Sequence, residues 1–387
     1  MADADRPDDV AGMTLPLDLD GRVDAVRDAV ASSAEGARDD GRVDRALLAE
    51  LGARGMIGRI FPEEFGGRGP AAASAVELCV LREGAARAST AAETAIALQG
   101  LGAFSILQAG SRALAQRWIP AVARGEAVAS FALTEPQAGS DPAALELAAE
   151  PDGDGWRLSG EKAWISNAPD ADVYTVFART SPASDGRGGR GVTAFVVAGD
   201  APGLTGEPLD LIAPHAVGRL AFDAVPVSRD DVLGEVDAGL RVAMATLDRF
   251  RPSVGAFAVG MAQAALDAAI AYTQQRETFG KPLAAHQAVA HDLAEMATRT
   301  QAARLLVYDA AARLDAGHRA TQAAAMAKLH ATETAQWVVD RALQFHGAAG
   351  LEEGHLLGHL YREVRAPRIY EGASEIQRTI VARELLG

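Results

Sequence analysis

Apolar residues recur at helical spacing over the first third of the chain, from Val23 to about Arg124, and Gly or Pro falls between the segments. Leu47, Leu48 and Leu51, for example, share one helical face. The Pro- and Gly-rich stretch 61–70 interrupts the pattern before it resumes. This region is therefore predicted to be all-helical, with at least four helices.

The pattern then changes to short runs of β-branched and aromatic residues that polar turns separate. These runs are 128–133, 156–158, 173–177, 192–197 and 220–222. Their length and spacing are typical of strands in a small barrel or sandwich. The glycine-rich stretch 185–191 is interpreted as a flexible hairpin tip and not as a phosphate loop, because no Lys-Ser/Thr follows it.

Long helical segments return after about Asp237, at 240–275, 284–316 and 320–344. Long antiparallel helices indicate a bundle. The order helices, strands, helices argues against a Rossmann fold, in which strands and helices alternate. We therefore predict an α+β multidomain fold. It comprises a flexible lead-in over 1–20, an all-helical domain over 21–126, a β-barrel domain over 127–236 and a four-helix bundle over 237–387.

Charge and composition exclude several classes of protein. The net charge of -15 does not favour binding to phosphate backbones, and an aromatic share of 5% provides few side chains for stacking on bases, so nucleic acid is not an expected partner. Cys79 is the only cysteine, so the chain forms no internal disulfide and no cysteine-based metal site, and a cytoplasmic location is expected. The apolar stretch 253–271 contains Gln263 and Asp267, which favours a buried bundle helix over a membrane span.

Five segments resemble, in order, the motifs of the acyl-CoA dehydrogenase family. They are FALTEPQAGSD (131–141), KAWISN (162–167), RETFGKPL (276–283), QFHGAAG (344–350) and RIYEGASEIQR (368–378). Taken alone, residues 134–141 are explained about equally well as a strand that runs into a turn. The resemblance, however, covers nearly the whole chain. It implies an FAD-dependent enzyme whose cofactor lies where the middle and C-terminal domains meet.

The resemblance also implies the residues that contact FAD. They are Phe131, Leu133, Thr134, Gly139, Ser140, Trp164, Ser166, Arg276, Thr278, Phe279, Gln287, Gln344, Gly347, Ala348, Ala373 and Glu375. Leu133 and Thr134 would touch the flavin ring, and Ser140 would meet substrate or pyrophosphate groups. Arg276, Thr278 and Phe279 would reach the pyrophosphate and adenine across a subunit boundary. Trp164 and Ser166 are two apart on a predicted strand, so both should face the flavin, where Ser166 would donate to flavin N5. The alternative is an amphipathic strand with a core tryptophan.

Glu371 is the predicted catalytic base. Removal of a proton beside a thioester carbonyl requires a positioned base, and a carboxylate serves if desolvation raises its pKa. The resemblance places Glu371 against the substrate's α-carbon, and it implies that the backbone N–H of Glu371 polarises the thioester oxygen. Without the motif, a solvated carboxylate at a helix start would be the better interpretation. Some branches of the family carry the base at a position that Phe250 occupies here.

Further residues are expected on the substrate side: Ser140, Asp248, Arg251, Tyr370 and Gly372. An i, i+3 ion pair explains Asp248 and Arg251 about as well as contact with the pantetheine arm. His355 and His359 have the i, i+4 spacing of metal ligands, but no third ligand is evident, and no metal site is predicted.

Four residues depart from the family pattern. Gln137 and Ala348 stand where glycine is usual, Ala373 replaces a frequent hydroxyl residue, and Glu375 replaces a frequent glutamine. Ala348 is tolerable if its φ is negative, whereas Ala373 removes one possible hydrogen bond to the cofactor.

The expected reaction is α,β-dehydrogenation of an acyl-CoA to the trans-2-enoyl thioester, as in fatty acid metabolism. An electron-transfer flavoprotein is the expected electron acceptor, and a homotetramer that shares its FAD between subunits is the expected assembly. The alternatives are an oxygen-using oxidase, a dehydrogenase of carrier-protein-bound acyl groups in a specialised-metabolite pathway, and a non-catalytic flavoprotein that binds other molecules, such as DNA. The sequence does not identify the acyl group.

Overall fold

The structure, a computed structural model, describes residues 18–33, 40–70, 73–182, 190–213 and 215–387. Most of the expected lead-in and of the expected hairpin tip at 185–191 lies outside these residues. The first helix starts earlier than predicted, because Leu19 and Asp20 already belong to it.

The N-terminal region is helical, as predicted. It contains α1 (Leu19–Ala31), α2 (Arg45–Ala53), α3 (Ala75–Ala88), α4 (Thr90–Ala109) and α5 (Arg112–Ala123), with 3-10 turns at Ile57–Ile60 and Glu63–Phe65. Short polar side chains start several of these helices. The hydroxyls of Ser74, Ser89 and Ser111 each accept a backbone N–H of the first turn, which satisfies a donor that the helix itself leaves free.

The strands of the middle region form one eight-stranded sheet. They are β1 (Ala129–Ala132), β2 (Ala148–Asp152), β3 (Gly155–Ser166), β4 (Val173–Arg179), β5 (Val192–Ala198), β6 (Leu204–Pro208), β7 (Val217–Val227) and β8 (Val232–Leu233). The order is β6-β7-β3-β2-β4-β5-β8, and β1 pairs in parallel with β4. β4 and β5 are buried along almost their whole length, which explains their continuous apolar sequence.

The sequence pattern underestimated this sheet. β2, β6 and β8 were not predicted, and β3 and β7 are far longer than the short apolar runs within them. Both long strands carry exposed polar residues, such as Arg157 and Glu161 on β3. Hydrogen bonds between β3 and β7 hold these residues in extended conformation, although their side chains have no apolar surface to bury.

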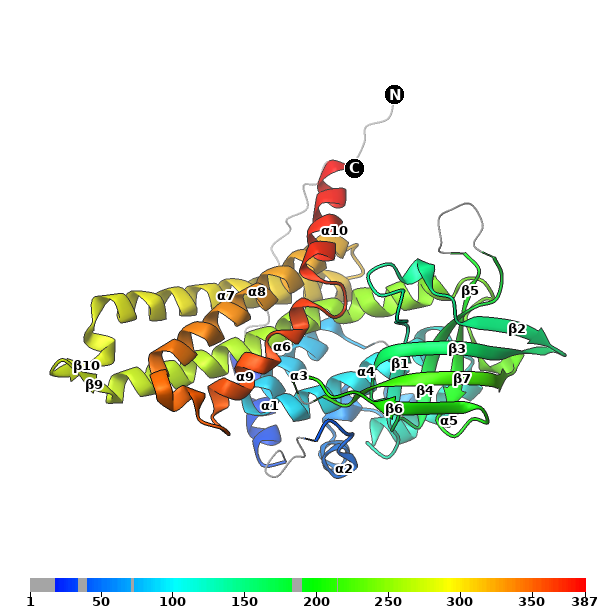
Figure 1. The fold of residues 1–387 in the computed structure, drawn as a ribbon, viewed down its shortest axis with the longest axis horizontal. Coiled ribbons are helices and arrows are strands. Elements are labelled where there is room, and N and C mark those ends of the chain that lie inside the picture. Colours follow the sequence, from blue (N-terminus) through cyan, green and yellow to red (C-terminus); the bar gives the residue numbers. More distant parts are fainter. Residues whose placement is uncertain (1–17, 34–39, 71–72, 183–189, 214) are drawn as a thin grey trace.

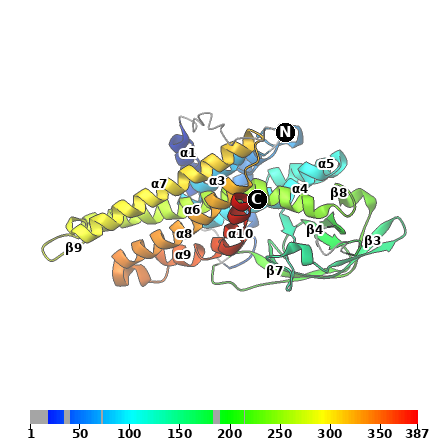
Figure 2. The same cartoon turned by 90° about the horizontal axis from the view of Figure 1, so that it is seen from above.

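The C-terminal region is a helical bundle. It comprises α6 (Gly239–Gln275), a hairpin of β9 (Glu277–Thr278) and β10 (Lys281–Pro282), α7 (Gln287–Asp315), α8 (Thr321–His346), α9 (Leu356–Glu363) and α10 (Ser374–Leu386). α6 packs against α7 and α8, and α10 packs against α8. Figure 1 shows that α6 runs along the molecule, with the β9–β10 hairpin at one end and the sheet at the other, and Figure 2 confirms this arrangement from above.

Two helices, α4 and α6, are long and apolar enough to cross a membrane by length and composition. In both, however, 67% of the apolar window is buried inside the fold, as in the core helix of a soluble protein.

Glycine lets α6 approach α3 closely. A Cβ on Gly260 would lie 2.5 Å from the carbonyl oxygen of Glu83. Most of the apolar stretch 253–271 is core, as predicted, whereas Asp267, Ile270 and Ala271 are exposed.

Candidate active site

Glu371 lies in a strained turn between the 3-10 turn Ala366–Arg368 and α10. Its φ is +50° and that of Gly372 is +89°, so two consecutive residues adopt left-handed backbone conformation. Such a conformation is costly for a residue with a Cβ, and the surrounding structure must hold it. Gln377 does so in part, because its Nε2 donates to the carbonyl oxygens of Glu371 at 3.2 Å and of Gly372 at 2.8 Å.

α8 anchors the same turn on both sides. The Nζ of Lys328 donates to the carbonyl oxygen of Gly372 at 2.7 Å. The carboxylate of Glu333 accepts from the hydroxyl of Ser374 at 2.6 Å and pairs with Arg368 at 2.9 Å. Two side chains of one helix therefore fix the position of the turn that carries Glu371.

The Glu371 carboxylate is desolvated. The residue as a whole is partly buried, but its Oε2 atom is inaccessible to solvent and has no hydrogen-bond partner among the described residues. Burial raises the pKa of Glu371 above its ordinary value, and nearby positive charges oppose this rise. These charges are on Arg82, Lys328 and Arg251. A carboxylate in this environment is a stronger base than one in water.

Two of these three cations have carboxylate partners of their own. Arg82, on α3, pairs with the buried Glu93 of α4 and donates to the hydroxyl of Ser253 at 3.0 Å. Arg251 pairs with Asp248 one turn away on α6, so the expected i, i+3 ion pair forms. Within the described part of the chain, Lys328 has no carboxylate within 4 Å.

Phe250 is completely buried against Phe104, with ring centroids 5.7 Å apart. The alternative position for a base therefore belongs to the apolar core. Tyr370 precedes Glu371, and burial raises the pKa of its hydroxyl well above the ordinary value, so the hydroxyl remains neutral at ordinary pH.

A second group of expected site residues lies in the middle domain. Phe131, on β1, packs against Phe177 with ring centroids 5.0 Å apart. Leu133 is buried, whereas Ser140 is exposed. Around Gly139 there is open space, because a Cβ there would meet no atom within 4 Å. The segment after β1 thus presents backbone and a hydroxyl to its surroundings.

The indole of Trp164 is 53% exposed, which is unusual for such a large apolar side chain. The φ of Trp164 is +54°, and the register of β3 against β7 shifts between Lys162 and Ile165. Ile165 is buried, whereas Trp164 is exposed and Ser166 is partly exposed. The core-tryptophan alternative is therefore wrong. Trp164 also lines a cavity of about 540 Å³, together with Pro136.

A third group lies at the far end of the C-terminal bundle. Arg276, Thr278 and Phe279 occupy the hairpin after α6, and the following Gln287 starts α7. Phe279 is 94% exposed and has a φ of +50°. A large exposed aromatic ring at a hairpin tip indicates a surface that another molecule covers.

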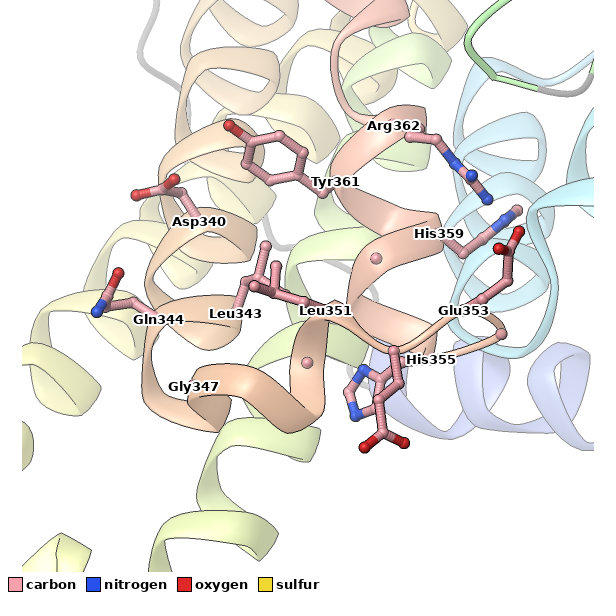
Figure 3. A pocket seen from close by; sticks show the side chains of 14 residues that line it. Asp340, Leu343, Gln344, Gly347, Leu351, Glu353, His355, His359, Tyr361 and Arg362 are labelled. Atoms are coloured by element: carbon pink, nitrogen blue, oxygen red, sulfur yellow. The ribbon is translucent and has the colours of Figure 1, made fainter.

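Gln344 and Gly347 line a cavity of about 930 Å³ beside this end of the bundle (Figure 3). Figure 3 shows Gln344 and Asp340 projecting from α8, with Tyr361 of α9 facing them and Arg362 projecting from the other side of α9. Gly347 has a φ of +57° with open space beside its Cα. The φ of Ala348 is not positive, so an alanine fits here without backbone strain, as the sequence analysis required.

Ala373 and Glu375 lie beside Glu371 at the start of α10. Ala373 provides no side-chain cap for that helix, and Glu375 is exposed and pairs with Arg378 at 3.3 Å. The structure therefore brings the flanks of the RIYEGASEIQR segment close to Glu371, as expected from adjacency in sequence.

His355 and His359 have protein partners. His355 Nδ1 accepts the backbone N–H of Leu357, and His359 Nε2 lies 2.7 Å from the hydroxyl of Thr90. Throughout the described residues, no group of three or more His, Cys, Asp or Glu side chains gathers in a way that could hold a metal ion.

One chain does not bring the second and third groups together. Trp164 belongs to β3, and Phe279 lies between β9 and β10. Figures 1 and 2 show the sheet and this hairpin at opposite ends of the molecule. α6 spans 37 residues, which corresponds to about 55 Å of helix.

Sequence reasoning assigned no role to several buried charged residues. Arg82, Lys162 and Lys328 are among them. A charged residue within an otherwise apolar helical face, such as Lys328 in AAAMAKLHA, is the signal that could have found some of them. Lys162 organises the FALTEPQAGSD segment, because its Nζ donates to the carbonyl oxygen of Leu133 and pairs with Glu135.

These features fit a flavin nucleotide. Trp164 offers an exposed aromatic face, and the neighbourhood of Gly139 has space for a close approach to backbone N–H groups. Arg276 is exposed and can donate several hydrogen bonds to a diphosphate. Glu371 stands apart from these contacts as an unpaired carboxylate.

Comparison with known proteins agrees with the geometry. Residues 22–126, 130–225 and 237–386 match the N-terminal, middle and C-terminal domains of acyl-CoA dehydrogenase, respectively. The probable acyl-CoA dehydrogenase FadE25 of Mycobacterium tuberculosis is 39% identical, over 89% of this chain and 88% of that protein. Cyclohexane-1-carbonyl-CoA dehydrogenase of Geobacter metallireducens is 35% identical, over 94% of each.

Among solved structures, butyryl-CoA dehydrogenase of Megasphaera elsdenii superimposes with a TM-score of 0.90 at 32% identity, and the match covers 97% of this chain and 100% of that one. The three matched domains occupy nearly the whole chain in the same order as the helical, sheet and bundle regions described above. The chain therefore belongs to the acyl-CoA dehydrogenase family, whose members bind FAD.

Proposed function

We propose that the protein desaturates an acyl thioester between Cα and Cβ, with Glu371 as the base that removes the α-proton. The observation that supports this role is the Glu371 carboxylate itself, which has a buried, unpaired Oε2 atom in a turn that α8 and α10 hold rigidly. A base that is desolvated and fixed in position is suited to remove a weakly acidic C–H proton. The product is the trans-2-enoyl thioester.

The backbone of the same turn supports polarisation of the thioester carbonyl. The N–H of Glu371 makes no hydrogen bond to any described residue, so it is available to a substrate oxygen. A donor aimed at the carbonyl oxygen stabilises the negative charge that develops there as the α-proton leaves. Bound FAD supplies the acceptor for the β-hydride.

The separation of the two cofactor-binding groups supports a shared FAD. Trp164 and its neighbours would contact the flavin end, whereas Arg276 and Phe279 of a second copy would contact the phosphates and adenine. The exposed Phe279 ring would then be covered by the assembly. We propose a homo-oligomer, a tetramer in line with the resemblance, and a cytoplasmic enzyme that passes its electrons to an electron-transfer flavoprotein.

A panel of thioesters tests the reaction. The purified, FAD-loaded protein would be mixed anaerobically with CoA thioesters of straight-chain, branched, cyclic and dicarboxylic acids. At least one saturated thioester should bleach the visible absorbance of the flavin and yield its 2-enoyl product. A colourless protein that takes up no FAD, or a flavin that none of the thioesters reduces, would contradict the proposal.

Two additions to the panel separate the alternatives. Rapid reoxidation of the reduced flavin by air would indicate an oxidase, whereas slow reoxidation favours an electron-transfer flavoprotein as the acceptor. Faster bleaching by an acyl group on a carrier protein than by the same group on CoA would indicate the carrier-linked reaction.

A further inference from the structure

We propose that Lys328 is a positioning residue for Glu371. It holds the carbonyl of Gly372, and its positive charge favours the ionised form of the neighbouring carboxylate. This inference rests on the proposed role of Glu371 as the base, and it assigns to α8 the task of keeping that base both aimed and charged.

The first part of the argument is geometric. Lys328 is completely buried, with 0% of its side chain exposed, and its Nζ lies 2.7 Å from the carbonyl oxygen of Gly372. That carbonyl belongs to a turn with two consecutive left-handed residues, of which Glu371 carries a Cβ. Because the turn is strained, it relaxes unless its carbonyls remain bound. Lys328 and Gln377 are the two side chains that bind them.

The second part concerns the charges that face Glu371 from each element around it. α3 contributes Arg82, α6 contributes Arg251 and α8 contributes Lys328, while the neighbouring Tyr370 remains neutral. Arg82 also pairs with Glu93, and Arg251 also pairs with Asp248. Lys328 forms no ion pair within 4 Å among the described residues, and its charge acts on Glu371 together with the larger influence of Arg82.

The charge state of Lys328 depends on its surroundings. Burial lowers the pKa of Lys328 to about 8, while the negative charges of Glu371, Glu333 and Glu375 favour its protonated form and Arg251 disfavours it. At neutral pH the ammonium group is still the main species. Loss of this charge raises the pKa of Glu371, so the base becomes protonated, and inactive, at a higher pH.

The test separates the charge of Lys328 from its hydrogen bond. Lys328→Met removes both, Lys328→Arg keeps the charge, and the control Gln377→Leu removes a hydrogen bond from the same turn without altering charge. The holoenzyme, with its flavin reduced beforehand, would be incubated in deuterium oxide with butyryl-CoA or cyclohexane-1-carbonyl-CoA. Deuterium exchange at Cα, followed against pH, then reports proton removal alone, because the reduced flavin accepts no hydride.

On the acid side of the pH profile, the exchange rate falls as the base becomes protonated; we call this fall the acid limb. In Lys328→Met we expect the acid limb to lie at a higher pH than in the wild type, and the exchange rate at pH 6 to be about tenfold lower. Gln377→Leu should lower exchange at every pH without moving this acid limb, and Lys328→Arg should keep the limb in place. If Lys328→Met does not fold, Lys328→Gln, which is neutral but retains a donor, should show the same displacement.

The inference would be overturned if the acid limb of the neutral Lys328 variant lay at the same pH as that of the wild type. It would also be overturned if Gln377→Leu shifted the acid limb as far as the Lys328 variant does. Absence of both exchange and flavin bleaching in the wild-type protein has a different meaning, because it would remove the proposed reaction itself.

Discussion

The Nζ of Lys162 lies 2.7 Å from Oε1 of Glu135, and both side chains are buried, with 0% and 1% of their surface exposed. The same carboxylate accepts the backbone N–H groups of Glu146 and Leu147 at 2.6 and 2.9 Å. One buried ion pair thus ties β3 to the loop that follows β1, where the FALTEPQAGSD segment lies.

Replacement of Lys162 by Met should destabilise the protein by about 3–5 kcal/mol, because it leaves the Glu135 carboxylate buried without a counter-charge. Arg157→Met is the control, since it breaks an ion pair with Asp152 in which both side chains are about half exposed. Its cost should stay below about 1 kcal/mol. The denaturant midpoints of the two variants measure these losses of stability. Equal shifts of the two midpoints would contradict the claim that the buried ion pair matters more than the exposed one.

The close crossing of α3 and α6 gives a second prediction. A Cβ on Gly260 would lie 2.5 Å from the carbonyl oxygen of Glu83, so Gly260→Ala should destabilise the protein by about 1–3 kcal/mol. In the control Gly358→Ala, on α9, the new Cβ would lie 3.5 Å from the carbonyl oxygen of Gly350, which is an ordinary contact. This change should stabilise its helix by up to about 1 kcal/mol. In thermal unfolding, the melting temperature should fall in Gly260→Ala and rise in Gly358→Ala. A rise in the melting temperature of Gly260→Ala would refute the close packing of α3 against α6.

Arg276→Ala should weaken FAD retention, because a diphosphate partner is lost at the hairpin end of the bundle. Arg241→Ala, at the start of α6, removes another exposed arginine, whose ion pair within the described part of the chain is with Glu235. The FAD content after gel filtration, measured for both variants, checks the prediction. If both lose FAD equally, or neither does, Arg276 is not a cofactor contact.

The sequence predicted the order of the three regions well, because long helices and buried strands have apolar patterns that depend only on local spacing. α6 was predicted from Leu240 to Gln275 and observed over Gly239–Gln275. β6 was missed because its residues are mostly exposed and its conformation depends on pairing with β7. Pairing with a distant strand leaves little trace in the strand's own sequence.

The site was predictable only in part, for a related reason. Glu371 was found through the IYEGASEIQ segment, but its left-handed backbone is held by hydrogen bonds from α8 and α10. The positive charges around its carboxylate come from α3, α6 and α8. Lys328 is 43 residues away in sequence and lies within an alanine-rich helix. Only the packing of α10 against α8 brings its ammonium group to the turn.

The most direct test of the account is the rate of flavin reduction by Glu371→Gln, measured anaerobically by stopped flow with the thioester that reduces the wild-type flavin fastest. The amide nearly preserves the shape of the side chain but cannot accept the α-proton. We expect a folded protein with its full complement of FAD and a rate of reduction lower by about 10²–10⁴-fold. A rate within a few fold of the wild type would show that another group removes the proton.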